Sequence, residues 1–300
     1  MAGQDRRGSR GPHRVSPEPT RPAGPVHVLA EVLAGKRIGA FSHLTLAAPG
    51  VGERHRPGSF VAVSVGAPGE RTRLARRAFW IHQVRALGGH AATVSLVVDP
   101  VGPGSRWLAG LSRGDRVEVT GPLGGRAFAL PKEPVPVVLV GEGAHSAPLF
   151  ALAERLRERD CPVHLLLGAA DEAHLLSALE ARRIARTVTV ATLDGSVGVK
   201  GPTAALLPDV LRRSGAAVVY AAGPVPLLHA VARAAEDHGA WSQVALGVPT
   251  PCATGLCHGC PVPVVGEDGV GRTVRACAEG PVLRGDRVRW DDLSVPGDAS

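Results

Sequence analysis

Before Pro131, apolar and polar positions along the chain follow one another in short runs separated by glycine and proline. Four of these runs have β-strand composition and cover residues 60–66, 77–84, 92–99 and 115–121. Helical periodicity is almost absent from this half of the chain. Short strands punctuated by turn residues predict an antiparallel β-barrel or sandwich, which we place at residues 25–131.

After Pro131, strand-like runs alternate with helical segments. The runs cover residues 135–141, 161–169, 187–193, 216–223 and 242–248, and the helical segments between them cover 146–160, 172–183, 202–214 and 225–239. This alternation predicts βαβ units that form a parallel sheet with helices on both faces, over residues 132–247. Ligands of such sheets bind beyond the carboxyl ends of the strands, at loops such as 141–145 and 223–224. Each loop either approaches a phosphate with its backbone N–H groups or is an ordinary turn.

Composition and charge narrow the possible classes of protein. The chain has 300 residues and is 44% hydrophobic, enough for a large core in more than one domain. No run approaches the length of about 18 apolar residues that a membrane span requires. Residues 1–24 are rich in Arg, Pro, Gly and Ser, and we expect a disordered basic tail there, not a secretory signal. We therefore expect a cytoplasmic protein.

The formal charge of +7 does not by itself indicate nucleic-acid binding. Residues 1–22 hold five arginines against two acidic residues, so the tail carries much of the excess charge. Aromatic residues make up 3% of the chain, which leaves few side chains for stacking on bases. A solvated basic surface explains the charge better, and we expect neither a nucleic-acid partner nor a membrane partner.

Four cysteines near the end of the chain are the strongest chemical signal. Four residues separate Cys252 from Cys257, two separate Cys257 from Cys260, and Cys277 follows later. This spacing matches the plant-type arrangement of thiolates that hold a 2Fe-2S cluster. Glycines between the ligands allow the tight turns that bring backbone N–H groups toward sulfur. The sequence predicts a small iron-sulfur loop subdomain at residues 248–300.

Two other interpretations of the cysteines remain. Structural zinc also uses four thiolates, although usually as two short pairs, whereas here three ligands share one loop. A disulfide framework fits less well, because the chain has five cysteines and no export signal. The fifth, Cys161, begins a predicted buried strand and is best interpreted as a small core residue.

The order of barrel, α/β domain and cysteine loop resembles the ferredoxin-reductase superfamily. Within it, the chain is most similar to the electron-transfer subunits of the two-subunit, NAD-linked dihydroorotate dehydrogenases. The stretches that carry this likeness are RRAFWI (76–81), GPGSRWL (102–108), GDRVEVTGPLGGRAF (114–128), DGSVGVKG (194–201), AAGPVPLL (221–228), and the cysteine loop with CAEGPVL (277–283).

The resemblance implies an oxidoreductase that passes electrons between a partner and NAD in pyrimidine biosynthesis. The partner would be the FMN-containing catalytic subunit, in a heterotetramer, and the carriers in this chain would be a 2Fe-2S cluster and FAD. Cys252, Cys257, Cys260 and Cys277 would ligate the cluster. The resemblance places Arg77, Phe79, Trp80, Gly102, Gly104 and Ser105 at the FAD, and Gly141, Gly143, Gly223 and Pro224 around the NAD cleft. It implies no residue that acts as a catalytic acid, base or nucleophile.

The chain departs from the family pattern at several cofactor positions. Ala78 and Trp80 stand where the flavin motif has proline and a small hydroxyl residue, and Glu142 and His145 stand where the NAD loop has glycine. Ala222 replaces a frequent cysteine. Two alternative functions therefore stay open: a cluster-bearing accessory subunit without NAD or FAD binding, and a free-standing NAD(P)H-dependent reductase with another acceptor.

Overall fold

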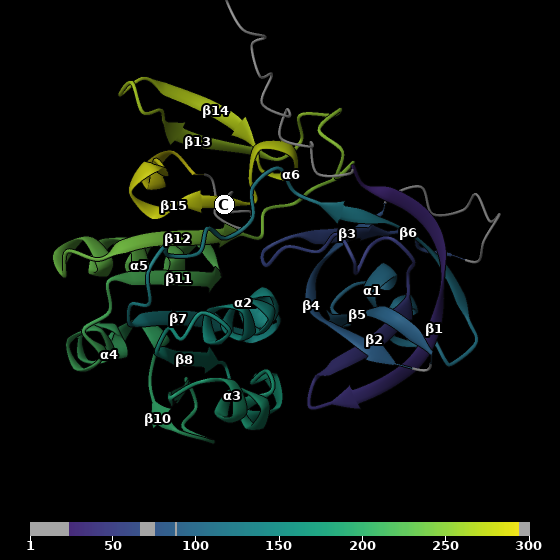
Figure 1. Cartoon of the computed structure of the whole chain (residues 1–300), viewed down its shortest axis with the longest axis horizontal. Helices are drawn as coiled ribbons and strands as arrows, with labels where there is room; N and C mark the ends of the chain where they lie inside the picture. The colour runs from purple at the N-terminus through teal and green to yellow at the C-terminus, as the bar shows by residue number, and fades with distance from the viewer. Residues whose placement is uncertain (1–23, 67–75, 88, 294–300) are drawn as a thin grey trace, which may run out of the picture.

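A computed structural model describes residues 24–66, 76–87 and 89–293, so the expected basic tail lies almost wholly outside the described residues. The first part of the chain is a closed antiparallel barrel with strand order β1-β2-β5-β4-β3-β6 (Figure 1). Its elements are β1 (Val26–Ile38), β2 (Phe41–Ala47), β3 (Phe60–Val63), β4 (Arg77–Leu87), β5 (His90–Val98), α1 (Pro103–Ala109) and β6 (Arg116–Leu123).

Alternation of buried and accessible residues explains the barrel strands. In β6, Val117 and Val119 are buried while their neighbours reach solvent, which is the period of two that a half-buried strand requires. Strands β1 and β2 and helix α1 were not among the expected elements. β1 is exposed over much of its length, and α1 is a single short helix that begins with proline and glycine.

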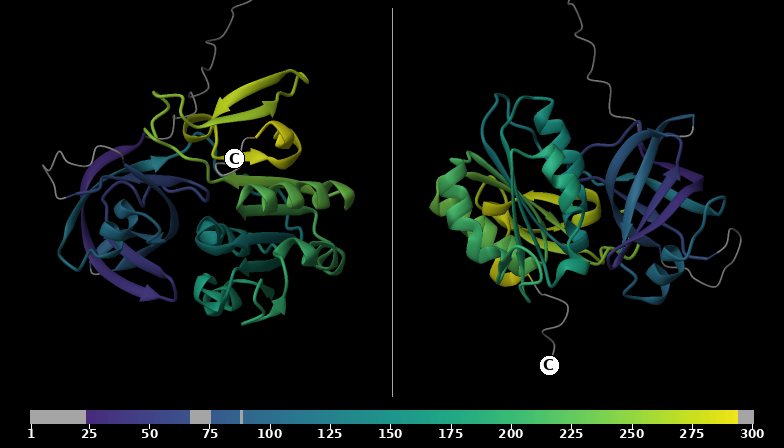
Figure 2. Two further views of the ribbon diagram at one scale, coloured as in Figure 1. Left: turned by 180° about the vertical axis from the view of Figure 1, so that it is seen from behind. Right: turned by 90° about the horizontal axis from the view of Figure 1, so that it is seen from below.

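The second part is a parallel sheet that continues into one antiparallel edge strand. The strand order is β10-β9-β8-β7-β11-β12-β15, and helices cover both faces (Figure 2). Its parallel strands are β7 (Val137–Glu142), β8 (Val163–Ala169), β9 (Thr187–Thr192), β10 (Val199–Lys200), β11 (Val218–Gly223) and β12 (Trp241–Leu246). Its helices are α2 (Ala147–Arg157), α3 (Ala178–Ile184), α4 (Leu207–Ser214) and α5 (Val225–Asp237).

Successive residues of the central strands pack on opposite helical layers. In β7, Val138 and Val140 join the core that contains α4 and α5, whereas Val137 and Leu139 join the core that contains α2 and α3. This explains why the strand is apolar throughout and not alternating. The expected helix at 172–183 begins only at α3, because Asp171 caps a short 3-10 turn ahead of it.

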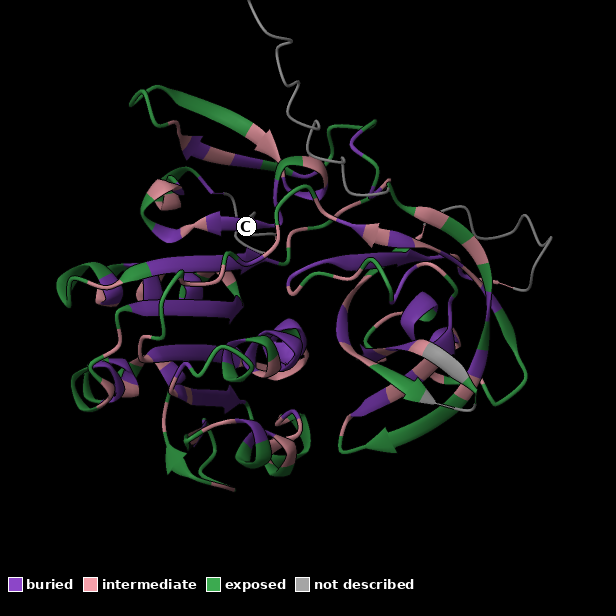
Figure 3. Ribbon diagram, viewed as in Figure 1, coloured by how far each residue is buried: buried purple, intermediate pink, exposed green. Residues whose placement is uncertain are grey.

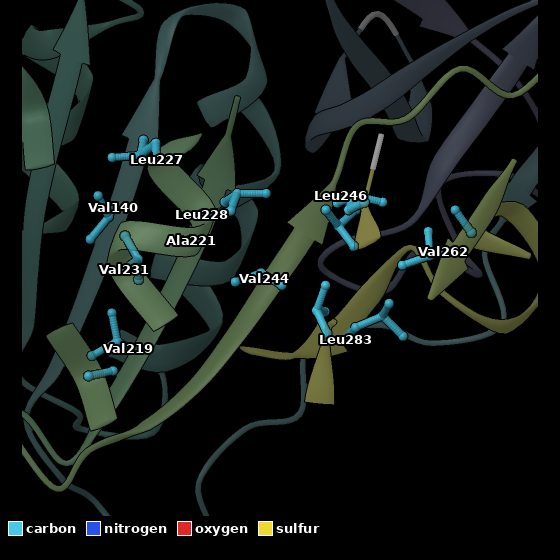
Figure 4. Close-up of a cluster of buried hydrophobic side chains, with 14 of the residues drawn as sticks. Val140, Val219, Ala221, Leu227, Leu228, Val231, Val244, Leu246, Val262 and Leu283 are labelled. Atoms are coloured by element: carbon cyan, nitrogen blue, oxygen red, sulfur yellow. The ribbon is translucent and has the colours of Figure 1, made fainter. Parts of the chain in front are cut away.

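The cysteine-bearing segment packs against the sheet. It contains the hairpin β13 (Pro261–Val265) and β14 (Gly271–Arg275), the short helix α6 (Ala276–Glu279) and β15 (Val282–Arg284). β15 pairs antiparallel with β12, so this segment supplies the last strand of the large sheet. One apolar cluster runs from the sheet through Leu246 and Leu283 to Val262 (Figure 4). The segment is therefore continuous with the core of the α/β domain.

Strand β4 connects the barrel to the α/β domain. The imidazole of His82 is buried and its Nδ1 lies 3.2 Å from the carbonyl oxygen of Ala147, at the start of α2. Arg85, also on β4, pairs with Glu154 on the same helix. Most of α2 is buried (Figure 3), as are Ile81 and His82 of β4. The strand expected to carry flavin contacts is thus fixed relative to β7.

The expected fold class is confirmed: an antiparallel barrel, a parallel-sheet domain and a small cysteine-bearing segment follow one another. Within the described ranges, every helix is too short or too polar to cross a membrane.

Candidate functional site

A cavity of about 530 Å³ lies where the barrel, the parallel sheet and the cysteine-bearing segment meet. The barrel contributes β4 and the turn before α1, and the sheet contributes the loops after β7 and β8. Val248, Thr250 and Pro281 close the side nearest the cysteines. Of the residues expected at FAD or NAD, the cavity is lined by Arg77, Phe79, Trp80, Gly102, Gly104, Ser105, Gly143 and Pro224.

Arg77 and Gly104 are in close contact on the barrel side. A methyl group at position 104 would lie 2.9 Å from Nε of Arg77, so glycine is required for the guanidinium to lie against the start of α1. The hydroxyl of Ser105 accepts from the backbone N–H of Gly102 at 3.0 Å and closes the turn. The arginine therefore presents its guanidinium to the cavity beside the start of α1.

Trp80 occupies the wall between the barrel and the cysteine-bearing segment. Its ring meets Phe60 edge to face with ring centroids 6.3 Å apart. The side chain is partly buried and packs against both apolar cores of the α/β domain. The indole is thus held in place by packing while one surface faces the cavity.

Gly141 and Gly223 do not line the cavity. A methyl group at position 141 would lie 2.4 Å from Cβ of Ser146, and one at position 223 would lie 2.8 Å from Leu227. Both glycines instead permit close packing between a strand end and the following helix. Gly143 has φ of 54°, a left-handed conformation that favours glycine.

Glu142 brings a carboxylate, and His145 an imidazole, into the cavity beside these glycines. Desolvation lowers the pKa of His145, against the raising effects of Asp99 and Glu142. The hydroxyl group of Thr203 donates a hydrogen bond to Oε2 of Glu142 over 3.0 Å. Sequence reasoning missed Thr203, because it lies 61 residues further along the chain. The only available signal was its position just after the family-like stretch 194–201.

The structure brings two of the four clustered cysteines into contact. Cys260 and Cys277 are buried with their sulfur atoms 3.3 Å apart, whereas Cys252 is half-buried and Cys257 is exposed. All four are free thiols, as is the buried Cys161. Within the described residues, no group of three or more His, Cys, Asp or Glu side chains is placed so that it could hold a metal ion.

Backbone N–H groups point at the sulfur atoms. Cys252 Sγ lies 3.5 Å from the nitrogens of both Thr254 and Cys257, and Cys257 Sγ lies 3.3 Å from the nitrogen of Gly259. Left-handed conformations at Ala253 and Gly255 help to turn the chain around the thiols. N–H groups so arranged stabilise thiolates and bridging sulfide.

The pKa values of two thiols reflect this environment. Burial acts to raise the pKa of Cys252, but the N–H groups of Cys257 and Thr254 outweigh it and lower the value to about 5. Burial, followed by the proximity of Cys260, raises the pKa of Cys277 to about 12. A thiolate at Cys277 is therefore favoured only when a positive charge lies nearby.

The cysteine-bearing segment matches a known family, and most of the chain is similar to known proteins. Residues 251–289 match the family described as the iron-sulfur cluster binding domain of dihydroorotate dehydrogenase B. The chain is 32% identical to the dihydroorotate dehydrogenase B (NAD(+)) electron transfer subunit of Desulforamulus reducens, over 81% of this chain and 90% of that protein. It is also 32% identical to the corresponding subunit of Geobacillus thermodenitrificans, over 82% of this chain and 91% of that protein.

Solved structures show the same architecture. A chain of an NADH-dependent reduced ferredoxin-NADP oxidoreductase superposes with a TM-score of 0.75 and 28% identity, covering 89% of this chain and 91% of that one. A ferredoxin NADP+ reductase from Neisseria gonorrhoeae, with bound FAD and NADP, has a TM-score of 0.57 at 14% identity. It covers 72% of this chain and 92% of that one, and shows the shared fold alone.

Proposed function

Because the chain belongs to the family of dihydroorotate dehydrogenase B electron transfer subunits, we propose that it carries electrons between a dihydroorotate-oxidising partner and NAD. Its carriers are a 2Fe-2S cluster and FAD. A bound flavin exchanges single electrons with such a cluster and a hydride with a nicotinamide. The partner is the FMN-containing catalytic subunit, which forms a heterotetramer with this chain in the cytoplasm and serves pyrimidine biosynthesis.

The cluster ligands are Cys252, Cys257, Cys260 and Cys277. Their donor set fits, because a 2Fe-2S cluster uses four thiolates, and backbone N–H groups approach the sulfurs of Cys252, Cys257 and Cys260. The buried pair, Cys260 and Cys277, lies in the apolar core shared with the sheet. These two residues hold the inner side of the site, and the loop residues Cys252 and Cys257 hold its outer side.

FAD contacts come from the barrel. Gly104 leaves the space that Arg77 fills, and a guanidinium suits a pyrophosphate. Phe79 and Trp80 supply apolar surface for the flavin ring, and Gly102 and Ser105 shape the adjoining turn. The residues present therefore fit the cofactor, with an indole in place of a small hydroxyl side chain.

NAD enters at the ends of β7 and β11. Gly143 and Pro224 line this side of the cavity, while Gly141 and Gly223 keep the two loops close to their strands. The two strands are neighbours at the point where the strand order reverses direction, which is where open α/β sheets bind ligands.

One observation carries the proposal: a single cavity touches the flavin-type strand β4, the nucleotide-type loop after β7 and Pro281, which follows the last cysteine by four residues. The test is to purify the chain without oxygen, together with its catalytic partner, and to measure flavin, iron and sulfide. We expect about one FAD and about two irons per chain, together with bleaching of the flavin by NADH.

Other results would favour the alternatives. About two irons without FAD would identify a cluster-bearing accessory subunit. Full cofactor content with rapid NADH oxidation, but no electron exchange with the dihydroorotate-oxidising partner, would identify a free-standing reductase. Either result would overturn the relay.

A further inference from the structure

Glu142 lines the cavity at the carboxyl end of β7. It ends β7, and the next strand on one side is β11, whose last residue is Gly223. A methyl group at position 223 would lie 3.6 Å from Cβ of Glu142. Glutamate therefore stands at the point where the order of the parallel strands reverses, in a loop where the family has glycine.

The position of this carboxylate is built into the fold and does not result from a flexible surface side chain. Thr203 is only 3% exposed and donates to Oε2 of Glu142 over 3.0 Å. Thr203 reaches this place because the facing residue of β8 is Gly168, where a methyl group would lie 1.7 Å from the threonine hydroxyl. Glu142 pairs with the same Gly168 in the sheet register.

A carboxylate only accepts hydrogen bonds, so it selects for donors on a ligand. The pyrophosphate of a dinucleotide offers acceptors and negative charge and would be repelled. The nicotinamide carboxamide offers an NH₂ group. Hydride transfer requires this ring, not the adenosine, to reach the part of the cavity lined by Trp80 of the barrel and Pro281 of the cysteine-bearing segment.

Resting on the function proposed above, we infer that Glu142 recognises the nicotinamide carboxamide of NAD. Its Oε2 is fixed by Thr203, and its other oxygen accepts from the carboxamide NH₂ group. Glu142 and Thr203 thereby orient the nicotinamide ring. A glycine at position 142, as in the family loop, has no side chain that could do so. Glu142 is a substrate-recognition residue of the NAD site and takes no part in proton transfer.

The test is equilibrium binding to the oxidised holoprotein, in which no electrons flow. Calorimetry compares three ligands: NAD+, its 3-acetylpyridine analogue, in which a methyl group replaces the carboxamide NH₂, and ADP-ribose, which lacks the base. The variants are Glu142→Gly, which restores the family residue, and Glu142→Gln, which keeps an acceptor oxygen. Glu133→Gln, on an exposed loop of the same domain, makes the same chemical change elsewhere and serves as the control. Flavin content verifies that each variant is folded.

We expect Glu142→Gly to weaken NAD+ binding about 10-fold, the loss typical of one hydrogen bond to a charged group. Binding of the acetylpyridine analogue and of ADP-ribose should stay the same or tighten, because a negative charge has been removed near the pyrophosphate. Glu142→Gln should lose less affinity for NAD+ than Glu142→Gly, and Glu133→Gln should match the wild type.

Three results would overturn the inference. Equal weakening of NAD+ and the acetylpyridine analogue would assign Glu142 to a ribose hydroxyl. Tightening of all three ligands would show that the carboxylate only repels the pyrophosphate. Failure of the wild-type holoprotein to bind NAD+ would reject the NAD arm of the proposed function itself, and the inference with it.

Discussion

The guanidinium of Arg275 donates to the carbonyl oxygen of Gly255 over 2.9 Å, and so joins the residue two positions before Cys277 to the middle of the cysteine loop. Its Nε donates to Glu279 at 3.1 Å, and the same carboxylate accepts from the backbone N–H of Arg275 at 2.9 Å. Glu279 belongs to the Glu-Gly-Pro-Val stretch that follows the fourth cysteine. The two charged residues therefore fasten α6 to the loop that carries the other three thiols.

Replacement of Arg275 by Gln should loosen this loop. Because the arginine and its partner are partly exposed, the contact stabilises modestly, and we expect iron release to a chelator to accelerate roughly three-fold. The release rate is followed by the visible absorption of the cluster. Arg275→Lys should fall between the variant and the wild type.

Arg272→Gln provides the matched control. Arg272 lies on the same strand and forms a similar exposed pair with Asp268, away from the cysteine loop. If iron release accelerates equally in the Arg272 and Arg275 variants, the cause is the loss of a positive charge from the strand and not the loss of the contact with Gly255.

Cys257→Ser should abolish the cluster and weaken docking of the partner subunit, although Cys257 is the most exposed of the four thiols. A serine hydroxyl is a poor ligand for iron in a thiolate site. Cys161→Ala changes a buried thiol two residues before β8 and should leave iron and sulfide unchanged. Normal iron content in purified Cys257→Ser protein would refute the ligand assignment.

Two half-buried histidines of the barrel should make stability depend on pH. Burial, assisted by His82, lowers the pKa of His43 to about 4, and burial, assisted by Arg155, lowers the pKa of His55 to about 4. The unfolded chain binds these protons more readily, so stability is lost as the pH falls from about 6.5 toward about 4.

Urea unfolding of the chain at about pH 7 and about pH 5 measures this dependence. The full shift would cost nearly 2 kcal/mol per histidine over that range, and partial hydration reduces this to about 1 kcal/mol each. A His43→Gln, His55→Gln double variant should lose correspondingly less stability on acidification. Parallel pH profiles for the wild type and the double variant would contradict the assignment.

The sequence predicted those elements whose signal is local. The buried strand β7 and helix α5 follow from apolar runs and helical periodicity, and the spacing of the cysteines points to one metal centre. The sequence does not predict strand β1, because most of its residues face solvent. Its pairing with β2 and β6, and not its own pattern, makes it a strand. Strand β15 has three residues and exists because β12 offers an open edge.

Side-chain contacts between distant segments were beyond sequence reasoning. The sequence shows that Glu142 departs from the family loop, but it does not show that Thr203 is its hydrogen-bond partner. This contact forms because Gly168 has no side chain, which lets Thr203 approach the sheet closely. The contact between Arg275 and Gly255 likewise depends on how α6 returns to the cysteine loop. Such contacts follow from tertiary packing, which neither periodicity nor motif spacing encodes.

Gly104→Ala should reduce FAD affinity as strongly as a change to Arg77 does. The new methyl group would lie 2.9 Å from Nε and 3.2 Å from an Nη of Arg77, so the guanidinium must move away from the start of α1. Loss of one charge-assisted contact to a pyrophosphate corresponds to about a 10-fold weaker Kd.

Gly110→Ala, at the other end of the same helix, would make only ordinary contacts at 3.5 Å or more and should bind FAD normally. Fluorescence titration of the deflavinated protein compares Gly104→Ala, Arg77→Gln and their double variant. Because both single changes remove the same contact, the double variant should be little weaker than either one. Additive losses would mean that Gly104 acts on FAD independently of Arg77.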